Sequence, residues 1–278
     1  MFNGLIKLSF IAVLATSAIS CQNSDRNGEK EAEDKYSQAK NCFDLGQYET
    51  ASALLSEIDS LYPKAVETRR KASLLRPELK ERWTAAQLSE IDSLLAVNTI
   101  IGDSLRNLIT FVDNPLEGYF VAKEIGKTDP RTDAGLHGRI SPGFKFYITS
   151  SSPNPIKSTS VRLSANGETV ETPTIPFDGE RNNRSGKCET ITFTEAESAP
   201  LGDFILRHNQ DAIGLTYIGE NGQERHSELP SIQKNSLATE YRYAKTVIRD
   251  KFLRLEKERL SKQLELSRQQ IARSRESR

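Results

Sequence analysis

The sequence is poor in cysteine and tryptophan and has no excess of charge of either sign. Its 278 residues include three cysteines and one tryptophan, and 38 Lys and Arg balance 38 Asp and Glu. Three cysteines cannot build the disulfide framework of a small secreted domain. A balanced charge gives no field that would attract nucleic acid. The sequence also lacks Cys-x-x-Cys, His-Glu-x-x-His, Gly-x-Ser-x-Gly and a glycine-rich phosphate loop. We therefore expect no enzyme, no cofactor and no metal site.

The first twenty residues have the pattern of an export signal. Lys7 is followed by an apolar stretch from Leu8 to Ala18 that is too short to span a bilayer, and small residues then precede Cys21. This arrangement resembles a bacterial lipoprotein signal, which implies cleavage after residue 20 and lipid attachment to Cys21. The alternative is an ordinary secretory signal followed by an incidental cysteine. With Gln22 in place of a retention-type aspartate, the resemblance favours the outer membrane of a cell envelope.

Residues 21–34 carry no large apolar side chain and are expected to form a flexible tether. Beyond them, residues 36–45 and 50–61 are two short amphipathic runs, typical of a helical hairpin. The hairpin has the spacing of one tetratricopeptide repeat in its glycine, tyrosine, alanine, leucine and proline residues. The hairpin therefore resembles that family over a single repeat, as in tetratricopeptide lipoproteins of outer-membrane assembly. The matching positions are Gly46, Tyr48, Ala51, Leu55 and Pro63.

Two longer segments show apolar residues at alternating three- and four-residue steps. The first runs from Leu79, after Pro77, to Val112, and completes a predicted helical part over residues 35–116. The second occupies residues 233–278 and ends in a basic tail. From Glu240 onward this segment has 12 Lys or Arg against 6 Asp or Glu. We expect an antiparallel coiled-coil stalk. The apolar stripe of the second stalk helix consists of Leu237, Tyr241, Ala244, Ile248, Phe252 and Leu255. Four further apolar residues follow among many charged ones: Leu260, Leu264, Leu266 and Ile271.

Between the stalk helices, residues 117–232 change to an alternating pattern of apolar and polar side chains, which predicts about eight short strands. One of these is expected at residues 203–207. Asn166-Gly167 and Asn221-Gly222 each predict a two-residue hairpin turn, because both central positions of that turn require positive φ. The expected fold is α+β, with an antiparallel β-sandwich or small barrel inserted between the two stalk helices.

The loop expected over residues 129–139 is the one place where the sequence invites a catalytic or cation-binding hypothesis. Arg131, Asp133 and His137 lie close together in it, and an enzyme would require these side chains to converge in a pocket. The three histidines of the chain have no metal-ligand spacing, so the alternative is that they are exposed loop residues.

Three short sequences resemble the Asp-Ser-apolar acceptor that some Gram-negative bacteria O-glycosylate. They place candidate glycans on Ser60, Ser93 and Ser104. The alternative is structural, because the leucine after each serine would pack inside a predicted helix. Cys42 and Cys188 fall in dissimilar segments, and each is expected to be a small buried hydrophobic residue.

These observations predict a lipid-anchored cell-envelope protein that acts as a non-catalytic binding or scaffold module, with an envelope protein as its partner. In the alternative, the β domain binds a carbohydrate or cell-wall fragment through exposed aromatic residues such as Tyr147 and Tyr217. An enzyme built on the 129–139 loop is the third class.

Overall fold

The structure is a computed structural model that describes residues 24–115, 117–126, 128–153, 156–185 and 187–276. These residues form five helices and ten strands, and the strands make two antiparallel sheets, so the fold is α+β. Neither sheet closes on itself, which rules out the predicted small barrel. The predicted signal peptide and the lipid-attachment residue Cys21 lie outside the described residues. Among the described residues, no helix has the length and apolar composition needed to cross a bilayer.

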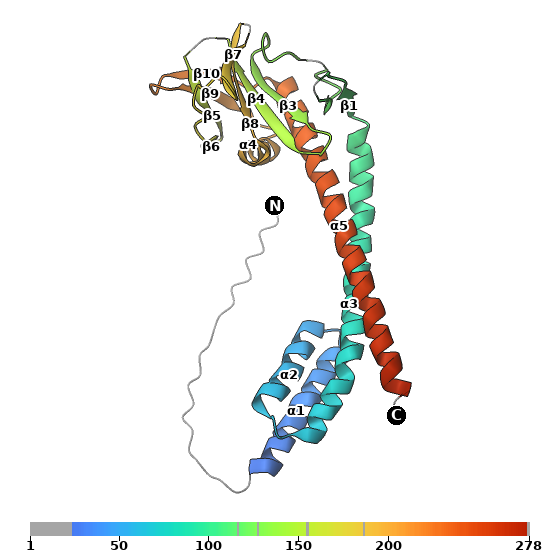
Figure 1. The fold of residues 1–278 in the computed structure, drawn as a ribbon. Coiled ribbons are helices and arrows are strands. Elements are labelled where there is room, and N and C mark those ends of the chain that lie inside the picture. Colours follow the sequence, from blue (N-terminus) through green and yellow to red (C-terminus); the bar gives the residue numbers. More distant parts are fainter. Residues whose placement is uncertain (1–23, 116, 127, 154–155, 186, 277–278) are drawn as a thin grey trace. The chain divides into compact units, whose positions relative to one another are not determined.

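The chain divides into two units. One comprises the residues up to Leu88 together with those from Leu260 onward, and the other comprises Ser89–Arg259. The first unit is helical. In it α1 (Ser24–Asp44) and α2 (Tyr48–Leu61) form the predicted hairpin (Figure 1). Gly46 in the turn adopts a φ of 76°, a left-handed conformation that favours glycine. The apolar core of this unit includes Ala39, Phe43, Ala51, Leu55, Ile58 and Leu75.

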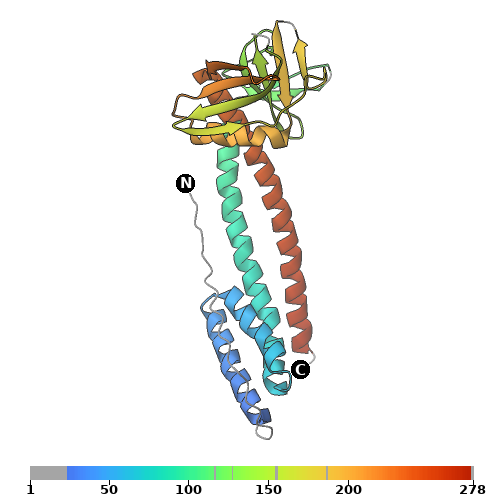
Figure 2. The same ribbon diagram turned by 90° about the vertical axis from the view of Figure 1, so that its left-hand side faces the viewer.

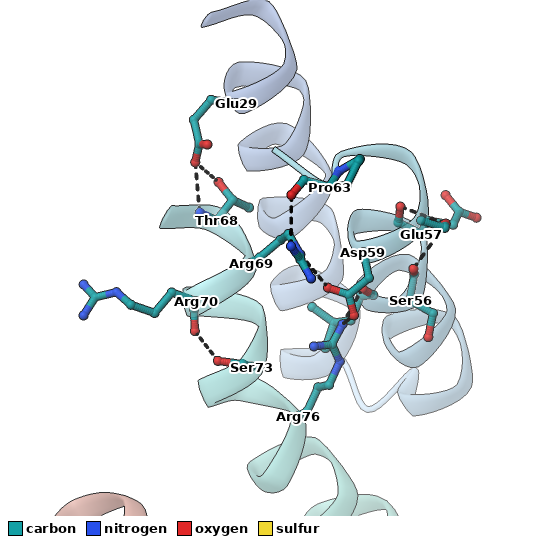
Figure 3. Close-up of polar contacts among 12 residues, drawn as sticks. Glu29, Ser56, Glu57, Asp59, Pro63, Thr68, Arg69, Arg70, Ser73 and Arg76 are labelled. Atoms are coloured by element: carbon teal, nitrogen blue, oxygen red, sulfur yellow. Dashed lines mark hydrogen bonds and ion pairs between the residues drawn. The ribbon is translucent and has the colours of Figure 1, made fainter. Parts of the chain in front are cut away.

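Polar contacts tie the hairpin to the start of α3 (Val66–Arg106), as Figure 3 shows. Asp59 of α2 accepts hydrogen bonds from Arg69 Nε, at 3.2 Å, and from Arg76. Glu29 of α1 accepts hydrogen bonds from the backbone N–H of Thr68 at 2.9 Å and from its hydroxyl at 2.8 Å. These contacts join all three helices.

Residues 24–34 are helical, which corrects the predicted tether. That prediction considered only composition, whereas the helix is held by contacts distant in sequence. Ala32 is fully buried in the helical core, and Glu33 forms an ion pair with Lys71 of α3 at 2.8 Å. Local composition cannot reveal such contacts.

The bounds of α3 also differ from the prediction. The helix begins eleven positions before Pro77, at Val66, continues through the proline and ends at Arg106. A proline inside a helix removes one backbone hydrogen bond. Packing on α2 holds this segment in place, because Arg76 donates a 2.7 Å hydrogen bond to the Leu55 carbonyl and Leu75 is buried. Residues 109–112, predicted to end the helix, form strand β1.

The second unit contains both sheets. The six-stranded sheet has the order β1-β2-β3-β4-β8-β7, and the four-stranded sheet has the order β10-β9-β5-β6. All strand pairs are antiparallel. The strands are β1 (Ile109–Val112), β2 (Tyr119–Ala122), β3 (Gly135–Ile140), β4 (Phe146–Ser152), β5 (Ser158–Ala165), β6 (Glu168–Glu171), β7 (Asn182–Ser185), β8 (Cys188–Phe193), β9 (Gly214–Gly219) and β10 (Glu224–Glu228).

One hydrophobic core is shared by both sheets and three helices. Ile148 and Phe193 contribute from the six-stranded sheet, and Val161 and Leu215 contribute from the four-stranded sheet. Helix α4 (Glu195–Arg207) and the start of α5 (Ser231–Glu276) contribute to it as well (Figures 1 and 2), and so does Leu105 near the end of α3. Each of these strand residues is fully or almost fully buried, so the alternating sequence pattern identified the core face of the strands correctly.

The two predicted hairpin turns have different outcomes. Asn166 and Gly167 adopt φ values of 51° and 81° and connect β5 to β6, as the sequence indicates. Between β9 and β10 only Gly222 has a positive φ, and the backbone N–H of Gly219 bonds to the Gln223 carbonyl at 2.8 Å. This second connection is therefore longer than the predicted two-residue turn.

Residues 203–207, predicted to form a strand, lie in α4. This helix starts with a capping box, in which the Thr194 side chain accepts from the Glu197 backbone and the Glu197 carboxylate accepts from the Thr194 N–H. Its buried residues have helical spacing, which the alternating pattern of the neighbouring strands obscured. These residues are Ser198, Leu201, Gly202, Phe204 and Ile205.

In this unit α3 and α5 lie antiparallel. Asn98 Nδ2 donates to the Thr246 carbonyl at 3.0 Å, and Lys257 pairs with Asp92 at 2.6 Å. The predicted stripe of α5 is only half correct. Its first three residues pack on the shared core, but Phe252 and Leu255 are 65% and 67% exposed. Other residues of α5, among them Thr246 and Lys257, contact α3 instead.

Candidate functional site

The 129–139 segment divides into two parts: residues 129–134 form a turn, and strand β3 begins at Gly135. His137 lies on β3 and is 4% exposed, and the Asp133 carbonyl lies 2.8 Å from its Nε2. Because a carbonyl only accepts, Nε2 carries the proton and Nδ1 accepts from the Thr128 hydroxyl at 3.0 Å. Burial lowers the pKa of His137. Both ring nitrogens of His137 are therefore occupied by hydrogen bonds.

Two glycines of β3 make room for polar side chains of α5. Gln233 Oε1 accepts from the Leu136 N–H at 3.2 Å, and a side chain at Gly135 would collide with this amide. Glu240 lies over Gly138 in the same way and accepts from the Ala122 N–H at 2.8 Å. The Gly-Leu-His-Gly sequence, predicted to be a loop, therefore forms a strand that is attached to α5.

Glu240 is fully buried, and its second carboxylate oxygen has no hydrogen-bond partner among the described residues. Burial raises the pKa of Glu240 to about 8, and the single hydrogen bond from Ala122 offsets only part of this effect. Burial therefore favours the protonated form of Glu240 at neutral pH. It fastens β2 to α5 at a point where β2 and β3 are paired through Phe120 and Ile140.

The charged residues of this segment do not converge on His137. Arg131 pairs with Asp129 at 2.8 Å, and both side chains are largely exposed. This hydrogen bond holds the pKa of Asp129 below its usual value. No group of three or more His, Cys, Asp or Glu side chains in the described part of the chain could hold a metal ion.

The other predicted residues lie apart from this segment. His208 is buried between Glu168 and Asp211, and His226 is exposed. The expectation of three exposed histidines is thus wrong for His137 and His208. Cys188 is buried and Cys42 is half-buried, and both are free thiols in different units.

The three candidate glycosylation serines are exposed on helices. Each hydroxyl donates to the carbonyl four residues earlier, at 3.4 Å for Ser60 and at 2.9 Å for both Ser93 and Ser104. Leu105 is buried, as its packing explanation requires, but Leu61 is 60% exposed. The packing explanation therefore fails for the first of the three sequences.

The outer face of the six-stranded sheet carries a groove of about 630 Å³, which we call the sheet groove. It lies on the side of the sheet opposite the shared core, where Arg139, Tyr147 and Thr192 alternate with buried residues. Arg139 and Tyr147 lie directly opposite each other on β3 and β4. The lining residues are Asn114, Glu117, Gly118, Tyr119, Arg139, Ser141, Gly143, Lys145, Tyr147, Arg181, Thr192, Phe193 and Thr194.

The sheet groove has a positive charge. Three cations line it, and only Arg181 has an acidic partner, Glu197, at 2.7 Å. Burial raises the pKa of Glu197, but hydrogen bonds from Arg181 and Thr194 lower it by more, so this carboxylate is ionised. Within the described part of the chain, the side chains of Arg139 and Lys145 are exposed and have no hydrogen-bond or ion-pair partner. The groove also contains Glu117, the one acidic residue in its lining.

Two tyrosines give the sheet groove its flat surfaces. Tyr119 and Tyr147 are both half-buried, so one part of each side chain remains accessible. Tyr217, the other aromatic residue predicted to be exposed, is buried and donates to the Ser151 carbonyl at 3.0 Å. Burial raises the pKa of Tyr217 to about 12. Of the two tyrosines predicted to contact a ligand, Tyr147 lines the sheet groove and Tyr217 does not.

No local sequence pattern marks Arg139, Lys145 and Arg181 as a group. They come from β3, the β3–β4 turn and the segment before β7, and only the pairing of the strands brings them together. Comparisons with known proteins found no matching family model, no matching curated protein and no matching solved structure.

Proposed function

We propose that the protein is a lipid-anchored cell-envelope binding module without catalytic activity, and that its sheet groove binds an anionic carbohydrate such as a cell-wall fragment. The observation that carries this proposal is a pair of cations, Arg139 and Lys145, whose side chains have no partner among the residues that the structure describes and which line the same groove as the accessible ring of Tyr147. The lipid on Cys21 would hold the protein at the membrane, in the outer membrane if Gln22 acts as the resemblance implies.

The chemistry of the groove fits this ligand class. Arginine binds carboxylate and phosphate groups through paired, charge-assisted hydrogen bonds. Tyrosine presents a flat apolar ring with a polar edge, which suits the apolar face and the hydroxyl groups of a sugar. Threonine and serine side chains in the lining add neutral donors and acceptors. A volume of about 630 Å³ lies in the usual range for a small-molecule site.

We also propose that the two sheets pack as a sandwich and that α3 and α5 form an antiparallel coiled-coil stalk. The shared hydrophobic core supports the first point. The contacts Asn98–Thr246 and Asp92–Lys257 in one unit, and Thr84–Gln263 in the other, support the second. The hairpin of α1 and α2 would be a single tetratricopeptide-like repeat, covered by α3 rather than by further repeats.

The test is calorimetric titration of the full-length protein with soluble peptidoglycan fragments that carry free carboxylates, and with the same fragments after amidation. Arg139→Gln with Lys145→Gln should weaken binding of the carboxylate form at least tenfold, because each charge-assisted hydrogen bond contributes about 1.5–3 kcal/mol. Arg225→Gln with Lys187→Gln removes two exposed cations outside the groove and should leave binding unchanged. Equal losses in both double variants, or no binding of either fragment, would contradict the proposal.

A second candidate function is docking of an envelope protein on α5. Ile248, Phe252 and Leu255 form an exposed apolar stripe with the four- and three-residue spacing of a helix-packing seam. A photoreactive amino acid at position 252 should cross-link one specific protein in native envelopes. The same reagent at the exposed position 249 is the control. A product of twice the chain mass would instead identify a second copy of this protein.

A further inference from the structure

A second cavity, separate from the sheet groove, lies where α3 and α5 approach the strands β1 and β2. It has a volume of about 490 Å³ and shares no lining residue with the sheet groove. We call it the seam cavity, because α3 and α5 contribute most of its wall. Its aromatic lining consists of Phe111, Phe120, Phe144 and Tyr243, and its helix-derived lining includes Asn98, Gly102 and Thr246.

Small and polar residues at the helix seam create this space. Away from the cavity, α3 and α5 carry large buried side chains such as Leu95 and Leu253. Beside the cavity the two helices carry Asn98, Gly102 and Thr246 instead. A Cβ added at Gly102 would touch only Thr246, at an ordinary 3.5 Å. A side chain could therefore begin at this position without a clash at its Cβ, and the sequence has none there.

Leaving this space open lowers stability. Glycine in a helix interior costs about 1 kcal/mol relative to alanine, and an unfilled core position loses the packing that a leucine would supply. Natural sequences depart from local stability rules mainly at functional sites. The open seam at Gly102 is such a departure.

The aromatic wall contains a second departure from local stability rules, a strained backbone at Phe144. Phe144 has a φ of 64°, and a bulky residue in this left-handed conformation is strained by roughly 1–3 kcal/mol. Its ring is held in place by neighbours: it stacks on Phe120 at 5.8 Å and meets Tyr243 edge-on at 6.2 Å. Lys251 lies over the same ring at 4.7 Å. The strained backbone thus directs an aromatic ring toward the cavity.

The charges around the cavity favour a ligand with an anionic head. Asp103 and Asp250 line it together with Arg106 and Arg254, and Lys251 adds a further positive charge at the Phe144 wall. Arg254 already neutralises Asp250, with Nε at 2.6 Å from Oδ2. Arg106 and Asp103 have no side-chain partner among the described residues, so the four charged lining residues sum to zero and Lys251 brings the total to +1. The local balance is therefore positive.

We infer that the seam cavity binds an amphipathic small molecule whose hydrocarbon body contacts the aromatic wall and whose anionic head faces Arg106. A fatty acid has this chemistry. The inference does not depend on the sheet groove, because the two sites have no residue in common.

The experiment uses the full chain with Cys21→Ser, so that no attached lipid or detergent competes. The probe is anilinonaphthalene sulfonate, which has an aromatic body and an anionic head, and its fluorescence reports binding. Dodecanoate should displace the probe from the unsubstituted cavity. Dodecyltrimethylammonium, with a cationic head, should displace it at least tenfold less effectively.

Gly102→Leu fills the cavity and should reduce probe affinity at least tenfold while the thermal midpoint stays equal or rises. Gly102→Met, with a more adaptable side chain, provides the same test if leucine prevents folding. Ile100→Ser is the matched control, because it removes an exposed apolar residue of α3, the helix that contains Gly102, outside the cavity lining and should not change probe binding. Unchanged affinity in the folded Gly102 variant, loss of binding in Ile100→Ser, or equal displacement by the cationic amphiphile would overturn the inference.

Discussion

The protonated carboxyl group of Glu240 makes the stability of the second unit depend on pH. Its pKa rises from the ordinary 4.5 to about 8 in the folded protein, because the side chain is fully buried. Between these two values the unfolded chain has lost the proton and the folded protein has kept it. The folded state therefore binds more protons, and the free energy of unfolding falls as pH rises. The Glu240 contribution is fully present below pH 4.5 and is lost by about pH 8.

The size of the effect follows from the pKa difference. One pKa unit corresponds to about 1.4 kcal/mol, so the contribution of Glu240 should fall by about 4 kcal/mol between pH 5 and pH 8. Glu240→Gln keeps the shape and the acceptor for the Ala122 N–H but cannot ionise. Relative to the original protein, this variant should become progressively more stable over the same pH range.

The assay is urea denaturation of the full-length protein, followed by circular dichroism at several pH values from 5 to 8. Glu228→Gln removes a carboxylate from the exposed strand β10 and serves as the control, for which no comparable pH-dependent difference is expected. If Glu240→Gln and the original protein differ by the same amount at every pH, the carboxyl group is not protonated in the folded state and the reasoning is refuted.

Three further predictions concern other parts of the chain. Gly138→Ala places a methyl group against the Glu240 carboxyl and should lower the free energy of unfolding by about 1–3 kcal/mol, measured by urea denaturation; no loss would show that the Glu240 side chain moves away freely. Cys21→Ala should abolish incorporation of labelled palmitate and release the protein from envelope membranes, and retention in the membrane fraction would contradict the lipid anchor. Asp59→Ala removes the carboxylate that accepts hydrogen bonds from Arg69 and Arg76 of α3. It should lower the free energy of unfolding of the helical unit by about 1 kcal/mol, measured by urea denaturation followed by Trp83 fluorescence.

The comparison of sequence and structure shows where local patterns are sufficient. Gly46 between two amphipathic runs marked the helical hairpin, and Asn166-Gly167 marked the β5–β6 turn, because both signals depend on the φ of one or two residues. The alternation around Ile148 and Ile191 identified core-facing strands for a similar reason. A period of two is a property of the extended chain itself.

Local patterns failed where contacts between distant segments decide the conformation. Gly135 and Gly138 favour a loop by composition, yet they lie in a strand because Gln233 and Glu240 of α5 occupy the space above them. The apolar stripe of α5 gave no sign that Phe252 would be exposed. The stripe keeps its period after the strands that cover its first part have ended.

The sequence by itself determined the helical hairpin, the β5–β6 turn, the signal pattern before Cys21 and the absence of common catalytic motifs, since each depends on residues close together in the chain. Only the tertiary structure decided which polar residues meet. It buried His137 and Glu240, separated Arg131 from both, and brought Arg139, Lys145 and Arg181 to one groove from three segments. Strand pairing and helix packing set these distances, and neither can be derived from the spacing of residues along one chain.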